Sequence, residues 1–281
     1  MIALSTSTAA AQSDGIAFDR ELRAHMKSAL DSTLARLQES HAGEKAVSDS
    51  RATATRQETR QSFVLPRLTI APNREIEVYL TRYRQRDRAQ IIRGFSRFAG
   101  YQPQIVASFA SEGVPQEIAL LGLVESGFDP LAVSPRQARG IWQFVPETGR
   151  RYGLRIGLGV DERTDPQKST RAAARYLADL YKMFGNWPLA LAAYNTGEAR
   201  VLSAVARAGT RDFWKLSRLG LLPAETRAYV PAVLAAILYV HGGASQFSES
   251  TILGDDSGRP TRRGRIFFAT LSATRAAGET D

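Results

Sequence analysis

The segment Leu120–Pro130 reads LLGLVESGFDP, an aliphatic run that ends in one acid, Glu125, just before a Ser-Gly break. In an α-helix each residue turns by about 100°. Glu125 then projects from the same side as Leu121, four residues earlier, and Ile118, seven residues earlier. Because those two aliphatic side chains are expected to face the core, the sequence predicts a partly buried carboxyl group at the end of a helix.

A buried carboxyl group has a particular chemical use. Burial disfavours its charged form and therefore raises its pKa. A carboxyl group that is still protonated near neutral pH can act as the general acid that cleaves a glycosidic bond. The alternative is a helix-end glutamate that is capped by backbone amides or paired with an arginine. The helix argument alone favours this alternative, because arginine is abundant in the chain.

The surrounding sequence is dense in helix signals from Gln102 to His241. Prolines and capping residues mark helix starts, and glycines mark helix ends. The sequence contains no strand-like alternation of useful length, so it predicts an all-α fold. The expected helices are a basic segment at 73–101 with a solvated charged face, Pro115 to about Ser126, a helix capped by Asp165 before Pro166 and ended by Gly185, one opened by Pro188, Glu198–Ala208, and 224–240.

The composition divides the chain into three parts. Residues 1–65 are expected to be an N-terminal extension, with a helical stripe at 16–40 and a polar linker at 41–62. Residues 66–242 are expected to form one helical domain that holds the motifs. Residues 243–281, which are rich in Ser, Gly, Thr and Arg, are expected to be a disordered tail.

The composition also excludes several kinds of site. The chain has no cysteine, which excludes disulfides and thiolate metal sites, and its three histidines are scattered. We therefore expect no metal site, no cofactor and no Ser-His-Asp triad. Apolar runs stay shorter than about 18 residues, so no membrane-spanning helix is expected.

The charge favours an anionic partner. The formal net charge is +9 and the sequence pI is about 10.1, a balance that favours nucleic acid, anionic lipid or an acidic cell-wall polymer. A solvated, arginine-rich surface explains the same charge without any partner. Nucleic acid is the weakest candidate, because its recognition needs basic and aromatic residues interleaved on one face, and the arginines here are dispersed.

Three later stretches carry the polar and aromatic side chains that line sugar-binding clefts. The stretch SPRQARGIWQF, from Ser134 to Phe144, contains a hydroxyl, a flexible glycine, an aromatic and an amide. AAYNTGEARV at 192–201 adds a phenol and an amide, and ETRAYVP at 225–231 adds a carboxyl group and a second phenol. Each stretch alone is a weak signal, since Tyr194 or Tyr229 alone is more often a core residue.

Taken in order, these motifs resemble those of the lytic transglycosylases of bacterial cell walls, whose catalytic domain is related in fold to goose-type lysozyme. The motifs are Glu-Ser at Glu125, Gly-x-x-Gln-Phe ending at Phe144, Ala-Tyr-Asn-x-Gly around Tyr194 and Glu-Thr-Arg-x-Tyr-Val from Glu225. The stretch 119–154 looks most like the branch called membrane-bound lytic murein transglycosylase D. The resemblance covers roughly 73–240 and implies a lysozyme-like (goose-type) helical domain with a helical N-terminal extension.

The resemblance also implies roles for individual residues. Glu125 matches the catalytic acid of the family. The residues that match its substrate-binding positions are Ser126, Ser134, Gln143, Tyr194, Asn195, Glu225 and Tyr229. In this family the glutamate protonates the glycosidic oxygen between N-acetylmuramic acid and N-acetylglucosamine. Its anion then takes the proton of the muramyl 6-hydroxyl, which attacks the anomeric carbon. The implied products have 1,6-anhydromuramyl ends, and the second carboxylate that most glycosidases need is dispensable.

The sequence leaves alternatives open. A lysozyme-type hydrolase on the same fold would use Asp129 or another acid to activate water, and a non-catalytic peptidoglycan-binding or secretion-system scaffold would need no acid. The resemblance implies peptidoglycan glycan strands as the partner and a periplasmic or cell-envelope location, and we expect a monomer. The first residues, with Ala9, Ala10 and Ala11, look like the small-residue end of an export signal that is not complete in this sequence.

Overall fold

The computed structural model describes residues 68–240. Helix accounts for 68% of these residues and strand for 4%, so the all-α prediction is confirmed for this part of the chain. The extension expected at 1–65 and the tail expected at 243–281 lie outside the described residues. The elements in chain order are α2 (Arg74–Arg84), α3 (Arg88–Ser111), the 3-10 helix η1 (Gln116–Leu120), α4 (Leu121–Ser126), α5 (Pro146–Arg151), β1 (Ile156–Gly157), β2 (Val160–Asp161), the 3-10 helix η2 (Glu162–Thr164), α6 (Pro166–Phe184), α7 (Trp187–Thr196), α8 (Glu198–Ala208), α9 (Phe213–Arg218) and α10 (Ala224–Val240).

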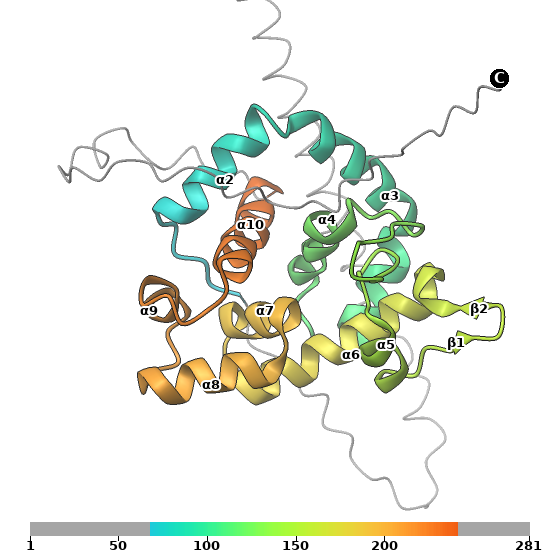
Figure 1. Cartoon of the computed structure of the whole chain (residues 1–281). Coiled ribbons are helices and arrows are strands. Elements are labelled where there is room, and N and C mark those ends of the chain that lie inside the picture. Colours follow the sequence, from blue (N-terminus) through green and yellow to red (C-terminus); the bar gives the residue numbers. More distant parts are fainter. Residues whose placement is uncertain (1–67, 241–281) are drawn as a thin grey trace, which may run out of the picture.

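The helix α10 lies at the centre of the fold. Figure 1 shows α2 and α3 arching over α10 and α4, with α6 crossing below them. The helix α10 packs along α2, α7 and α4, and α6 packs against α7 and α3. Because α10 is apolar on every side, most of its residues are buried, as expected of a helix surrounded by others. The hydroxyl of Tyr83 in α2 donates to the carbonyl of Ala232 at 3.0 Å and joins the first and last described helices.

Several predicted helix boundaries are confirmed. The side chain of Asp165 caps α6 by accepting from the backbone amides of Gln167 and Lys168, and proline stands in the first turn. The same helix ends at Gly185, whose φ of +72° is a left-handed conformation that glycine adopts without a steric cost. The helix expected at Glu198–Ala208 has those bounds.

The helix expected from Pro115 to Ser126 is divided into η1 and α4. A 3-10 helix has 3.0 residues per turn rather than about 3.6, so the α-helical phase assumed for Ile118 is wrong. The phase from Leu121 to Glu125 lies within α4 and stands. Ile118 and Leu121 are both fully buried, so this side of the segment does face the core.

Two further features differ from the expectation. The segment 73–101 was expected as one helix, but the chain breaks between α2 and α3, where buried Asp87 accepts from the guanidinium of Arg82 at 3.2 Å. A short hairpin, β1–β2, was not expected at all. Its turn residues Leu158 and Gly159 have φ values of +49° and +80°, which suit a tight hairpin turn.

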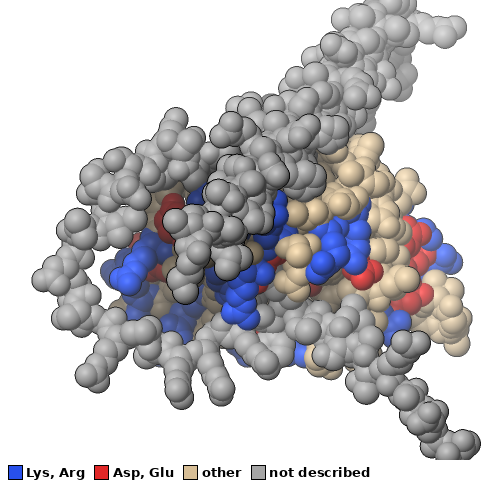
Figure 2. Space-filling model, turned by 90° about the horizontal axis from the view of Figure 1, so that it is seen from above, with Lys and Arg blue, Asp and Glu red and all other residues tan. Residues whose placement is uncertain are grey.

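The surface of the described part is rich in basic side chains. Figure 2 shows Lys and Arg side chains in several clusters on the face above α2 and α3, with fewer acidic ones. Arg86 in the turn between these helices and Arg93 on α3 are exposed, which fits the solvated face predicted for the basic segment. Within residues 68–240, none of the helices is both long enough and apolar enough to cross a membrane.

Candidate active site

Glu125 lies in the last turn of α4, just before a sharp reversal of the chain. Gly127 and Phe128 both have left-handed backbones, with φ values of +63° and +57°. The hydroxyl of Ser126 donates to the carbonyl of Ile141 at 2.9 Å and accepts from the amide of Asp129 at 3.0 Å. These two bonds fasten the end of the helix to the loop that follows, so Ser126 helps to fix the position of the neighbouring glutamate.

Tyr229 of α10 reaches the carboxyl group of Glu125. Its hydroxyl donates to Oε1 of Glu125 at 2.6 Å, across 104 residues of sequence. Burial raises the pKa of Glu125 to about 7, the hydrogen bond from Tyr229 opposes that rise, and the charge of Glu225 adds to it. Among residues 68–240, Glu125 forms no ion pair with an arginine, although other acids of the region such as Asp129 and Glu225 do. The alternative of a glutamate paired with an arginine is therefore not supported in this part of the chain. A carboxyl group with this pKa is present in both protonation states near neutral pH, as an acid that later acts as a base requires.

The helix α7 adds Tyr194 and Asn195 to the same region. The hydroxyl of Tyr194 donates to the carbonyl of Trp142 at 2.8 Å. The pKa of Tyr194 is raised well above its usual value, first by burial and then by the charge of Glu125, which places the two side chains near each other. Asn195 accepts from the hydroxyl of Thr226 at 2.8 Å and so links the end of α7 to α10. The structure therefore brings Glu125, Tyr194 and Tyr229 together from three helices.

Ser134 and Gln143 lie in the loop between α4 and α5. The hydroxyl oxygen of Ser134 accepts from the amide of Ala138 at 3.0 Å, and within residues 68–240 its hydrogen has no acceptor. Gln143 has a strained left-handed backbone with φ +48°, and its amide nitrogen donates to the carbonyls of Gly140 at 2.9 Å and Ala132 at 3.4 Å. These bonds shape the loop. The Ser134 hydroxyl hydrogen and the Gln143 amide oxygen have no protein partner among the described residues.

The aromatic residues of this loop have a different role from the one expected. Trp142 is 0% exposed and Phe144 is 2% exposed, and the indole nitrogen of Trp142 donates to the hydroxyl of Thr170 at 3.0 Å. The expectation that this stretch supplies an aromatic face for a sugar is therefore wrong, because both rings are part of the core.

Arg163 was not identified from the sequence, although it holds the loop in place. Its side chain is 5% exposed and forms an ion pair with Asp161 at 2.7 Å. It also donates to the carbonyls of Gln137 at 2.7 Å and Phe144 at 3.0 Å. Gly140 lies so close that a Cβ atom there would stand 1.9 Å from the carbonyl oxygen of Arg163. The Asp-x-Arg spacing of 161–163 was the available signal, but it is too common among so many arginines to have been decisive.

Two further acids of the region, Glu225 and Asp129, each lie within 4 Å of an arginine. Glu225, whose side chain is 57% exposed, lies at the protein surface and forms an ion pair with Arg136 at 3.4 Å. Asp129 accepts from the amide of Leu131 at 2.9 Å and lies 3.9 Å from Arg97. Within the described part of the chain, no group of His, Asp and Glu residues is arranged to hold a metal ion.

The described geometry places one partly buried acid beside the buried phenol of Tyr229, the partly buried phenol of Tyr194 and a polar loop. Residues 103–217 match the family model described as "Transglycosylase SLT domain". This segment of the chain is therefore similar to the SLT domain family. Six predicted site residues, from Glu125 to Asn195, lie inside the matched span, whereas Glu225 and Tyr229 follow it.

Two relatives that match this part of the chain are named as lytic murein transglycosylases. The chain is 46% identical over 140 residues to "Membrane-bound lytic murein transglycosylase D" of Escherichia coli (strain K12), a match that covers 48% of this chain and 30% of that protein. It is 34% identical over 117 residues to "Membrane-bound lytic murein transglycosylase F 2" of Alkalilimnicola ehrlichii, covering 39% of this chain and 25% of that one. The chain therefore spans only about a third of the length of these relatives or less.

Among solved structures, the chain is similar to the 70 kDa soluble lytic transglycosylase of Escherichia coli. The two are 27% identical, with a TM-score of 0.46, over 52% of this chain and 24% of that one.

Proposed function

We propose that this protein is a lytic transglycosylase that cleaves the β-1,4 bond between N-acetylmuramic acid and N-acetylglucosamine in peptidoglycan. The observation that carries the proposal is the contact between Glu125 and Tyr229 at 2.6 Å, on a carboxyl group whose pKa is about 7. The SLT domain and the names of its relatives support the same substrate class. The site belongs, on this proposal, to a domain spanning about 66–242 that acts in the cell envelope, where the polymer lies.

The proposed reaction uses Glu125 twice. The protonated carboxyl group gives its proton to the glycosidic oxygen as the bond to the anomeric carbon breaks. The resulting carboxylate takes the proton of the muramyl 6-hydroxyl, whose oxygen forms the new bond to the anomeric carbon. The acid is regenerated, no water is consumed, and the product carries a 1,6-anhydro ring. A pKa near the working pH favours both proton transfers.

The neighbouring groups support this cycle. Tyr229 donates to the carboxylate form of Glu125 and stabilises it between the two steps. Ser134, Gln143 and Asn195 are proposed to bind the sugar rim through hydroxyl and amide groups, and Tyr194 to form part of the cleft wall. Ser126 is proposed to act mainly through its bonds to Ile141 and Asp129, which fix the helix end.

Digestion of purified sacculi tests the proposal. The wild-type protein is compared with Glu125→Gln, which is nearly isosteric but has no acidic proton, and the muropeptides are weighed by mass spectrometry. We expect anhydro products from the wild type, each one water lighter than a hydrolysis product, and a loss of several orders of magnitude in the variant. Glu147→Gln, at an exposed glutamate of α5, is the control and should keep full activity.

Other product patterns would replace the proposal. Reducing ends without the anhydro ring would show a hydrolase, with Asp129 as the acid to test next. Binding to sacculi without any cleavage by the wild type would show a scaffold protein. Full activity in a folded Glu125→Gln protein would remove Glu125 as the acid.

A further inference from the structure

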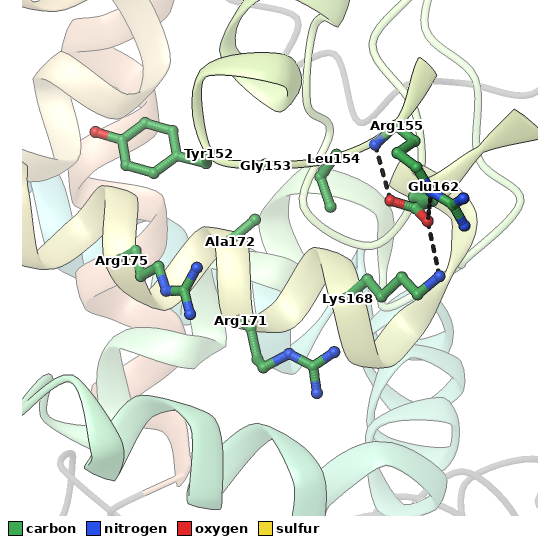
Figure 3. Close-up of a pocket in the computed structure, with 9 residues that line it drawn as sticks. All are labelled: Tyr152, Gly153, Leu154, Arg155, Glu162, Lys168, Arg171, Ala172 and Arg175. Carbon is green, nitrogen blue, oxygen red and sulfur yellow. Dashed lines mark hydrogen bonds and ion pairs between the residues drawn. The ribbon is translucent and has the colours of Figure 1, made fainter. Parts of the chain in front are cut away.

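A hollow between α6 and the segment 152–155 has four basic residues in its lining, and Glu125 is not part of it. Its volume is about 330 Å³. Figure 3 shows one wall formed by α6 and the other by the segment 152–155, with Glu162 near one end. The residues that line it are Tyr152, Gly153, Leu154, Arg155, Glu162, Lys168, Arg171, Ala172 and Arg175.

Helix geometry places the cations of α6 in one row. Lys168, Arg171 and Arg175 are spaced by three and four residues, so they stand one above another on the same face of α6. The side chains of Lys168 and Arg175 are 39% and 57% exposed, and Arg171 is exposed as well. With Arg155 on the opposite wall, the hollow has four cations and one carboxylate, which leaves a net charge of +3.

The one carboxylate in the lining is already fully engaged. Glu162 accepts from the backbone amide of Arg155 at 2.8 Å, from its guanidinium at 2.6 Å and from Lys168 at 2.7 Å. The hydrogen bond from Lys168 and those from Arg155 lower the pKa of Glu162 to about 2. Glu162 therefore stays ionised and holds two of the cations in place without neutralising the other two.

Those other two cations have donor groups to spare. Arg175 uses Nε to bind Glu112 at 3.2 Å, which leaves its two terminal nitrogens without a partner in residues 68–240. Arg171 forms no hydrogen bond or ion pair with any described residue. Two guanidinium groups one helical turn apart are suited to carboxylates, which they bind through paired hydrogen bonds.

The hollow lies within reach of the candidate active site. The ring of Tyr194 contacts that of Tyr176 at a centroid distance of 5.1 Å, and Tyr176 contacts Tyr152 of the hollow at 4.9 Å. A peptide of four residues spans up to about 14 Å when extended. A short peptide on a sugar bound near Tyr194 is therefore long enough to reach Tyr152, which lines the hollow together with Arg171 and Arg175.

We propose that this hollow is a second binding site, which takes a carboxylate of the peptides attached to the muramyl residues of peptidoglycan. This inference rests on the proposed function, because it takes peptidoglycan as the substrate. It adds that the protein distinguishes strands that carry peptides from bare glycan, through contacts separate from those that break the bond.

The test separates the two kinds of contact. Co-sedimentation measures binding to intact sacculi, and isothermal titration calorimetry measures binding to the soluble glycan strands that remain after an amidase has removed the peptides. Release of anhydro ends from this bare glycan measures the chemistry. We expect Arg171→Glu, and the double variant Arg171→Ala with Arg175→Ala, to weaken binding to intact sacculi about tenfold, the loss of roughly one charge-assisted contact. Both variants should bind and cleave bare glycan as the wild type does.

A matched control is Arg218→Glu. Arg218 is also an exposed arginine, it lies in α9, and Figure 1 shows α9 on the side of the fold away from the β1–β2 hairpin. This variant changes the net charge by two units, as Arg171→Glu and the double alanine variant do, and should bind intact sacculi as the wild type does. Equal weakening by Arg218→Glu would show a general charge effect and overturn the proposal.

A direct measurement completes the test. The Nε–Hε signals of Arg171 and Arg175, followed by NMR, should shift when a soluble muramyl peptide is added to the Glu125→Gln protein and stay unchanged with bare glycan. Loss of cleavage on bare glycan in the Arg171 variants would instead make the hollow part of the catalytic site, and unchanged binding to intact sacculi would also refute the inference. Failure of the proposed function would appear separately, as absent anhydro products from the wild type.

Discussion

Replacing Glu125 by glutamine should change how the stability of the protein depends on pH, even with no substrate present. The pKa of Glu125 is raised from 4.5 to about 7, mainly by burial. Between these two values the folded protein binds more protons than the unfolded chain, so the free energy of unfolding falls as the pH rises. This loss of stability is absent below pH 4.5 and complete above pH 7. Glutamine cannot ionise and has no such cost.

The size of the effect follows from the pKa difference. Each pKa unit corresponds to 1.36 kcal/mol, so the rise to about 7 gives an upper limit of about 3 kcal/mol. We therefore expect Glu125→Gln to gain up to about 3 kcal/mol over the wild type between pH 4.5 and pH 8. Tyr229 can still donate to the amide oxygen of glutamine, so the contact between α10 and α4 is kept.

Urea denaturation of both proteins at pH 4.5, 5.5, 6.5 and 8 measures this difference. Other titrating groups, such as Asp161 and Glu162 with their lowered pKa values, cancel in the comparison because both proteins contain them. Glu147→Gln provides the control and should show no trend with pH relative to the wild type. A Glu125→Gln difference that is the same at all four pH values would refute the argument that this carboxyl group is destabilised when ionised.

Three other predictions concern the same region. Tyr229→Phe removes the hydrogen bond that lowers the pKa of Glu125, so the basic limb of the pH–rate profile should move to higher pH by about one pH unit. A basic limb at the same pH as in the wild type would show that the bond does not act on the acid. Gly140→Ala should lower the free energy of unfolding, measured by calorimetry, by about 2–5 kcal/mol, because φ is +81° and the new methyl group meets the Arg163 carbonyl. Gly153 has a similar φ of +86° but open space around it, so Gly153→Ala is the control and should lower the free energy of unfolding by only about 1–2 kcal/mol. Raising sodium chloride should weaken binding to sacculi and raise KM while kcat stays nearly constant, since the screening length falls from about 10 Å at 0.1 M to about 3 Å at 1 M; binding that is independent of salt would contradict a role for the net charge of +9.

Local signals in the sequence predicted the helix boundaries well. Asp165 with Pro166 and the glycine at 185 determine the ends of α6 through contacts within one turn, so reading along the chain was sufficient. The 3-10 conformation of η1 is not signalled in the same way, because its residues would suit an α-helix equally well. The β1–β2 hairpin was missed since each strand has two residues, and leucine at position 158 is an unusual choice for a left-handed turn.

The candidate site was predictable only in part. The position of Glu125 near the core followed from its spacing to Leu121 within α4. Its contact with Tyr229 joins positions 104 residues apart, and no periodicity reports such a distance; the two were grouped only by resemblance to a family. The burial of Trp142 depends on its contact with Thr170 of α6, and the hydrogen bonds of Arg163 depend on how η2 packs against the loop before α5. The sequence alone does not reveal either contact.

The central position of α10 has a consequence for the biosynthesis of the protein. Tyr229 lies on the last described helix, and that helix packs along α2, the first one. A ribosome that has completed α2 to α9 has therefore made the whole segment matching the SLT domain, but not the phenol that contacts the acid. Nascent or truncated chains that stop before Ala224 should lack the contact between Glu125 and Tyr229. The proposed cleavage activity should therefore arise only when synthesis has passed almost the entire described fold.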